Sequence, residues 1–352
     1  MRVALTCLIM LTASIAPPVA AQSEEAAAPP SPHEAAFVVA GEPDHDREQP
    51  VGVIAGHVYA LPALIEGLAL DDPLMRARCA FLLGQIASPD GTDALRQALN
   101  DSDRDVRMFA GMALARMGDS DGLPAAHAAY YGNRWWIRYW AIDALARLDR
   151  VPEVALEDPD PLVRGIAEDG RRGGWEPASA TAEYPGPVDA SLDDIIFNFT
   201  TYMVGETDWW WHAGHYEQII RGNETIVWLD PEFLDGLTNS AYLYWSLERD
   251  VEALATYRRA VSMHPDEWEA HFELGFFYFN AQRRFADAVP LFKRARELGA
   301  PPERARLHAH ALEKSGRVDE AYEVWRELVA NTPDDPVARQ NLQRLKEIIG
   351  SG

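Results

Sequence analysis

The sequence is poor in cysteine, with only Cys7 and Cys79 among its 352 residues. Cys7 lies in an N-terminal segment that is predicted below to be removed, so the mature chain would keep a single thiol and could form no intramolecular disulfide. Cys79 lies in an apolar stretch beside Ala80 and Phe81, which predicts a small buried thiol.

Basic residues are scarce relative to acidic ones. The chain has 32 Lys and Arg against 55 Asp and Glu, which gives a formal net charge of −23. A surface this negative repels nucleic-acid phosphates and anionic lipids, so the composition argues against a nucleic-acid partner and against binding to a membrane surface. The same charge favours solubility and a basic partner.

Catalytic signatures are also missing. The sequence has no Gly-rich phosphate loop, no Gly-x-Ser-x-Gly elbow and no Cys/His nucleophile pair. His212 and His215, followed by Glu217, have a spacing typical of metal ligands, but Gly214 stands at an expected turn and breaks that geometry. We therefore predict a non-enzymatic protein with no catalytic residue, cofactor or metal. An enzyme whose site is spread over several helices remains the alternative.

The first residues have the pattern of a signal peptide. Arg2 is followed by an apolar run over residues 3–15, and the small residues Val19-Ala20-Ala21 precede Gln22. The run is shorter than the roughly 20 residues that span a membrane, so cleavage after residue 21 is predicted, with an uncleaved anchor as the alternative.

The remaining chain contains no other segment long and apolar enough to span a bilayer. Residues 22–57 begin with an Ala/Pro/Glu-rich stretch and show no usable periodicity, which predicts a disordered or irregular N-terminal segment. The mature protein is therefore expected to be periplasmic or secreted, with no integral membrane span.

A repeat of 31 residues occupies residues 58–172. Apolar residues recur three and four positions apart within each copy, and turn-forming clusters precede each helix, so each copy predicts a helical hairpin that must stack on its neighbours. The copies align as Asp72 with Asp103, Arg76 with Arg107, Cys79 with Ala110 and Leu83 with Leu114, followed by Ile137, Arg138, Ala141, Leu145 and Leu148 in the third unit and by Asp160, Val163, Arg164 and Ala167 in a shorter fourth unit.

The recurring Asp and Arg are predicted to cap helices and to pair between adjacent repeats, with an anion-binding stripe as the alternative. These units resemble the HEAT-like repeat of the phycobilin-lyase type, through Asp-x-x-[Val/Ile]-Arg followed by Ala-x-x-x-Leu. The resemblance implies a helical solenoid over about a third of the chain and brings no activity, because lyase function in that family belongs to cytosolic proteins.

Aromatic residues cluster in the third unit. Trp135, Trp136, Tyr139 and Trp140 fall within one predicted helix. Their spacing favours packing in the core and between repeats, and a carbohydrate-stacking patch is the alternative.

A different period begins after residues 173–190, which are rich in Gly, Arg, Pro and Ser and predict a linker. Prolines 231, 265 and 333 stand at multiples of 34 residues. The helix before each proline carries the same two features at the same positions. A small residue lets neighbouring helices approach, and an aromatic residue fills the gap between units. The proline then ends the helix. The matching sets are Ala253, Ala288 and Ala321, then Tyr257, Phe292 and Trp325, then Ala260, Ala295 and Leu328.

This second pattern is similar to the tetratricopeptide repeat. Units are expected near residues 200–233, 234–267, 268–301 and 302–335, within a domain over residues 191–350. The first unit is looser, because Glu206 stands where a large apolar residue is usual, so its first helix is expected to be shifted or irregular. The predicted fold is all-α, with a HEAT-like and a tetratricopeptide α-solenoid array joined by a linker.

The resemblance implies a concave groove, formed by the first helices of the units, that holds an extended peptide or a helix. We therefore predict a protein–protein interaction scaffold or adaptor of the cell envelope that binds an apolar or aromatic-bearing protein segment, with a basic group at the far end of the groove.

The alternative for the groove is that some of its candidate residues pack against the capping helix or the first array. A carbohydrate- or peptidoglycan-associated protein that uses exposed tryptophans is the alternative function. The pattern predicts neither the partner's identity nor the oligomeric state. The candidate partner-binding residues are Trp211, Tyr242, Trp245, Phe272, Phe276, Phe279, Asn280, Arg306 and His310.

Overall fold

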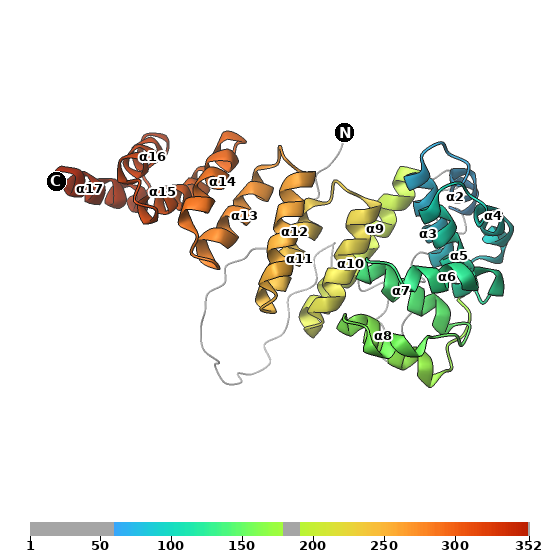
Figure 1. The fold of residues 1–352 in the computed structure, drawn as a ribbon. Helices are drawn as coiled ribbons and strands as arrows, with labels where there is room; N and C mark the ends of the chain where they lie inside the picture. Colours follow the sequence, from blue (N-terminus) through green and yellow to red (C-terminus); the bar gives the residue numbers. More distant parts are fainter. Residues whose placement is uncertain (1–59, 179–190, 351–352) are drawn as a thin grey trace, which may run out of the picture. The chain divides into compact units, whose positions relative to one another are not determined.

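The computed structural model of the chain describes residues 60–178 and 191–350, which form sixteen α-helices and no strand within these ranges (Figure 1). All of these helices belong to one compact unit. The predicted signal peptide, the irregular N-terminal segment and residues 179–190 of the predicted linker lie outside the described residues. The predicted all-α solenoid class is confirmed.

The first array consists of short antiparallel helices joined by tight loops. Three of its helices begin directly after an aspartate, as the repeat predicts: Asp72, Asp103 and Asp160 each accept hydrogen bonds from the backbone N–H groups of the first helical turn. The helices are α2 (Leu61–Gly67), α3 (Pro73–Ile86), α4 (Thr92–Ala98), α5 (Arg104–Arg116), α6 (Leu123–Tyr130), α7 (Trp135–Ala146) and α8 (Pro161–Arg172).

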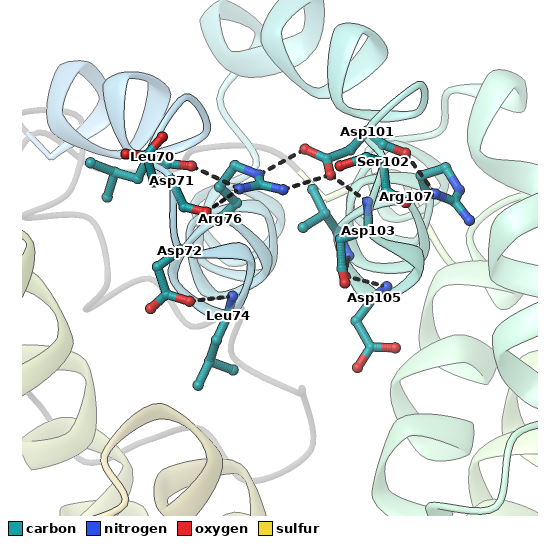
Figure 2. A network of polar contacts seen from close by, with 11 residues as sticks. Leu70, Asp71, Asp72, Leu74, Arg76, Asp101, Ser102, Asp103, Asp105 and Arg107 are labelled. Atoms are coloured by element: carbon teal, nitrogen blue, oxygen red, sulfur yellow. Dashed lines mark hydrogen bonds and ion pairs between the residues drawn. The ribbon is translucent and has the colours of Figure 1, made fainter.

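The recurring arginines tie the loops of neighbouring repeats together (Figure 2). Arg76 donates from Nε and Nη2 to the carboxylate of Asp101, at 2.8 and 2.9 Å, and from Nη1 to carbonyls of its own loop. Arg138 forms the same pair of bonds with Asp158. The predicted pairing between adjacent repeats is confirmed. These guanidinium groups are bound within the array instead of forming an open anion-binding stripe.

The junction between the repeats of α5 and α7 is built differently. Gly132 stands three residues before the first residue of α7, in the place that Asp101 and Asp158 occupy before α5 and α8. Arg107 of α5 therefore donates only to the carbonyls of its own loop. The two repeats are joined instead by an exposed ion pair at 3.0 Å between Arg134, before α7, and Asp105 of α5. Since exposed pairs contribute little, this junction is held mainly by packing.

The second array begins with α9 (Leu192–Ala213) and α10 (Tyr216–Leu229), and both pack into the core of the first array. Phe81 of α3 lies at the centre of this contact, with ring centroids 5.6–6.1 Å from Phe109, Trp140, Phe199 and Trp228. Two of those rings come from α9 and α10. The predicted boundary at residues 173–190 therefore separates two repeat patterns whose nearest helices share one core.

The later helices of the second array match the predicted repeat positions. The alanines 253, 288 and 321 are each 0% exposed, and Tyr257, Phe292 and Trp325 are at most 1% exposed. The irregular first unit is also as predicted, because α9 has 22 residues whereas α11 and α13 have 13 each. The remaining helices are α11 (Leu234–Ser246), α12 (Asp250–Met263), α13 (Trp268–Asn280), α14 (Phe285–Glu297), α15 (Ala305–Lys314), α16 (Val318–Asn331) and α17 (Pro336–Gly350).

Two local predictions in the first array are confirmed by burial. Cys79 is 1% exposed, and burial raises the pKa of its thiol to about 12, so the thiol is unreactive at neutral pH. Trp136, Tyr139 and Trp140 are at most 8% exposed, which confirms the packing interpretation for three of the four cluster residues, whereas Trp135 is half-buried.

Candidate functional site

Three aromatic side chains form a continuous line across α11 and α13. Tyr242 and Trp245 lie three residues apart on one face of α11, with ring centroids 6.1 Å apart. The ring of Trp245 meets that of Phe276 in α13, with centroids 6.3 Å apart. All three rings pack against the core of the second array and stay half-buried, so part of each remains open to a partner. We call these three residues the aromatic row.

Two carboxylates lie beside the aromatic row, and the sequence analysis missed them. Glu269 and Glu273 are one turn apart on α13, and Glu273 is three residues before Phe276, which places them on the same side of the helix. Burial raises the pKa of both carboxyl groups; Arg304 opposes the shift at Glu273 and Glu269 reinforces it. A nearby cation would stabilise these desolvated carboxylates.

Phe272 is a correction to the predicted set. It is only 2% exposed, and its ring packs on Phe292 of α14 with centroids 5.5 Å apart. The side chain therefore belongs to the core between the two helices of its own unit. Phe276, one turn further along α13, takes the surface position.

Three other predicted residues lie apart from the aromatic row. Trp211 is at the end of α9, where its half-buried ring meets Tyr216 edge-on at 5.7 Å. Phe279 turns toward α14 and packs on Phe285 at 5.3 Å. Asn280 is exposed at the end of α13. Among the described residues no ring contact joins Trp211 or Phe279 to the row, so the site that the geometry assembles is smaller than the predicted one.

The predicted basic end of the groove is not free. Arg306 is ion-paired at 2.8 Å with Asp335, which also caps the start of α17. His310 packs edge-on against Trp325 at 5.0 Å, and burial lowers the pKa of its imidazole, so the ring is uncharged at neutral pH. Both residues serve to hold the last helices together.

The tryptophans bear on the carbohydrate alternative. All eleven lie within the described residues, and every one is buried or half-buried. An exposed indole would be the mark of a sugar-stacking platform, and none of the eleven is exposed. The carbohydrate alternative is therefore not favoured.

Within residues 60–178 and 191–350, no three His, Cys, Asp or Glu side chains are grouped so as to hold a metal ion. Nor does any helix in these ranges combine the length and apolar character needed to cross a bilayer.

Comparisons with known proteins bear on the first array. The family model for HEAT repeats matches residues 61–146, which run from α2 to the end of α7. No curated protein matches the sequence. Among solved structures, yeast Tom70 is 11% identical, with a TM-score of 0.35 over 89% of this chain and 70% of that chain.

A TM-score this low supports no statement about the function of this chain. The fold and the family match together define an all-helical α-solenoid whose first array is similar to HEAT repeats. The finer resemblance to the phycobilin-lyase type stays a prediction.

Proposed function

We propose that this chain is a non-enzymatic interaction scaffold of the cell envelope that binds a protein segment along the aromatic row. The observation that carries the proposal is the line of half-buried rings formed by Tyr242, Trp245 and Phe276 on successive first helices of the second array. Large aromatic side chains that are held in place yet remain partly open to water are the residues that dominate protein-binding energy.

The charges beside the row define the chemistry of the partner. Glu269 and Glu273 favour a positive group next to an apolar contact, and the chain carries a net charge of −23. The bound segment is therefore expected to present an apolar or aromatic side chain together with Lys or Arg. Its charge would speed encounter with the acidic scaffold, so the association rate should fall as salt is raised.

The test is capture of partners from a cell-envelope extract by the mature protein beginning at Gln22, compared with a Trp245→Ala/Phe276→Ala variant. We expect the variant to lose the partner that the parent retains, with affinity reduced by about tenfold or more because two central aromatic anchors are truncated. Circular dichroism would establish that the variant keeps its helices.

A matched control removes two aromatic rings elsewhere. Tyr131 and Phe197 are 60% and 61% exposed, so Tyr131→Ala/Phe197→Ala truncates similar side chains away from the row. The control should capture the partner as the parent does. Equal capture by all three proteins would contradict the proposed site and move it to another face of the solenoid.

Export to the cell envelope is the second part of the proposal, and it rests on the signal-peptide pattern of residues 1–21. The protein recovered from the envelope fraction is expected to begin at Gln22, as measured by mass spectrometry of the intact chain. A variant with Leu8→Arg in the apolar run should remain in the cytoplasm with its first residues intact, because a charge breaks that run. Recovery of the parent from the cytoplasm with residues 1–21 attached would contradict this part.

A further inference from the structure

A cleft of about 460 Å³ lies between the two arrays, within the compact unit that contains all the described helices. Its walls come from α3, the start of α7, α10 and α12. The volume is that of a small-ligand site, which typically measures roughly 300–1,000 Å³. The charged residues that line the cleft are three arginines, Arg78, Arg134 and Arg259, and one glutamate, Glu224. This balance is the reverse of the acidic character of the whole chain.

Arg78 is the most buried of the three arginines, at 8% exposed. Its Nε and Nη2 donate to the backbone carbonyl of Trp228, at 3.0 and 2.8 Å, near the end of α10. Among the described residues no carboxylate forms an ion pair with Arg78. Burial lowers the pKa of its guanidinium, and the carboxylates of Asp72 and Asp230 oppose that shift from a longer distance. A neutral carbonyl satisfies hydrogen bonds without balancing the charge, so the positive charge at the wall of the cleft is offset only in part, by the more distant Asp72 and Asp230.

Arg134 adds a second positive feature at the start of α7. Three other helices of this array have a capping aspartate at this position, whereas α7 has Arg134, whose side chain makes no capping hydrogen bond. Trp135 and Trp136 of this first turn line the cleft, so the positive end of the helix dipole lies at its wall.

The single glutamate of the cleft is already neutralised. Glu224 accepts two hydrogen bonds from Nη1 of Arg259, at 2.7 and 3.0 Å. Apart from Glu224 no carboxylate of the described residues lines the cleft, and Arg134 is ion-paired only with the exposed Asp105 outside it, at 3.0 Å. The half-buried indoles of Trp135 and Trp228 lie beside the two arginines. Positive charge next to flat apolar surface is the chemistry that recognises an anion attached to an apolar body.

We propose that this cleft binds a small organic carboxylate with a flat apolar body. The carboxylate lies between the Arg78 and Arg134 guanidinium groups at the start of α7, and the apolar body packs on Trp135 and Trp228. The cleft and the aromatic row share no residue, so the proposal is independent of the protein-binding function proposed above.

The test is calorimetric titration of the mature protein with 3-phenylpropionate and with its neutral amide. The carboxylate should bind at least tenfold more tightly than the amide, because only the carboxylate brings a negative charge to Arg78 and can replace the exposed Asp105 as the partner of Arg134. Equal binding of acid and amide, or no binding of the acid at millimolar concentration, would overturn the proposal.

The decisive variant is Arg134→Asp, which restores the residue that the other repeats have at this position. The new aspartate should cap α7, and the exposed Arg134–Asp105 pair that it removes contributes little, so the melting temperature should hold or rise. The affinity for 3-phenylpropionate should nevertheless fall tenfold or more, because the charge at the site is reversed. A gain in stability together with a loss of binding separates a ligand site from a merely structural arginine.

The matched control is Arg284→Asp. Arg284 is likewise the residue before a helix, is likewise 46% exposed, and is ion-paired with Asp287 at 2.8 Å, but it does not line the cleft. This variant makes the same change in net charge and should bind 3-phenylpropionate as the parent does. Equal weakening by both variants would mean that only the net charge of the protein matters, and would overturn the assigned site.

Discussion

Asp143→Ala is expected to lower the free energy of unfolding by about 3–5 kcal/mol. Asp143 is 4% exposed in α7 and accepts hydrogen bonds from Arg116 Nε at 2.9 Å and Arg147 Nη2 at 3.1 Å. Arg116 is itself 5% exposed and also donates to the carbonyl of Gly84 in α3. Removing the carboxylate takes the ion pair with Asp143 away from a buried guanidinium, at a point where α3, α5 and α7 meet.

The same carboxylate gives the effect a characteristic dependence on pH. Burial acts to raise the pKa of Asp143, but Arg116 and Arg147 outweigh it and hold the pKa below its ordinary value. A carboxyl whose pKa is lowered by folding stabilises the folded state above its unfolded pKa of about 3.9, and that stability is lost as the pH falls through the folded pKa. The difference between parent and variant should therefore be full at pH 7 and narrow below about pH 4.

Urea denaturation followed by circular dichroism at pH 7, 5, 4 and 3 would measure both effects. The control is Asp93→Ala, which removes a carboxylate that is 90% exposed and pairs with Arg96 on the surface. That change should stay within about 0.5 kcal/mol at every pH. A difference between parent and Asp143→Ala that does not depend on pH would exclude the ion pair as its source.

Phe81→Ala is expected to have an effect of similar size, about 3–5 kcal/mol. Phe81 is 3% exposed, and its ring meets aromatic rings of both arrays, including Trp140 from α7 and Trp228 from α10. The cavity left by truncation lies where the two repeat patterns join. We therefore expect the first array and α9–α10 to lose stability together, in one transition.

Unfolding of this variant is best followed by tryptophan fluorescence and circular dichroism on the same samples. Phe292→Ala is the matched control, because Phe292 is 1% exposed but lies in the core of the later helices. It should lower the stability of the second array and leave the urea midpoint of the first core nearly unchanged, since solenoid stability is a sum of local terms. Equal effects of both variants on every probe would show that the whole solenoid unfolds as a single unit.

The repeat positions could be predicted because each unit solves the same packing problem at a fixed spacing. Ala253 and Tyr257, with their equivalents, are buried as the period requires, and Arg76 forms the expected bond to the following loop. Those contacts are local to a repeat or to its neighbour, so they leave a periodic signal in the sequence.

Contacts between distant segments leave no such signal. Arg78 and Trp228 are 150 residues apart, and nothing periodic connects them. The burial of Phe272 and the pairing of Arg306 with Asp335 likewise depend on how one helix is rotated against the next, which spacing does not specify. One usable signal was present at the cleft, because Arg134 replaces an aspartate that the repeat has elsewhere.

The shared core has a consequence for how such a chain is assembled in evolution or in the laboratory. Solenoids commonly gain or lose whole repeats, since each repeat contacts only its neighbours. In this chain α9 and α10 contribute Phe199 and Trp228 to the core of the first array, so the exchangeable block runs from residue 60 to 229. A graft cut at residues 173–190 would expose apolar surface on both products, whereas repeats after α10 are the ones that can be transplanted or duplicated.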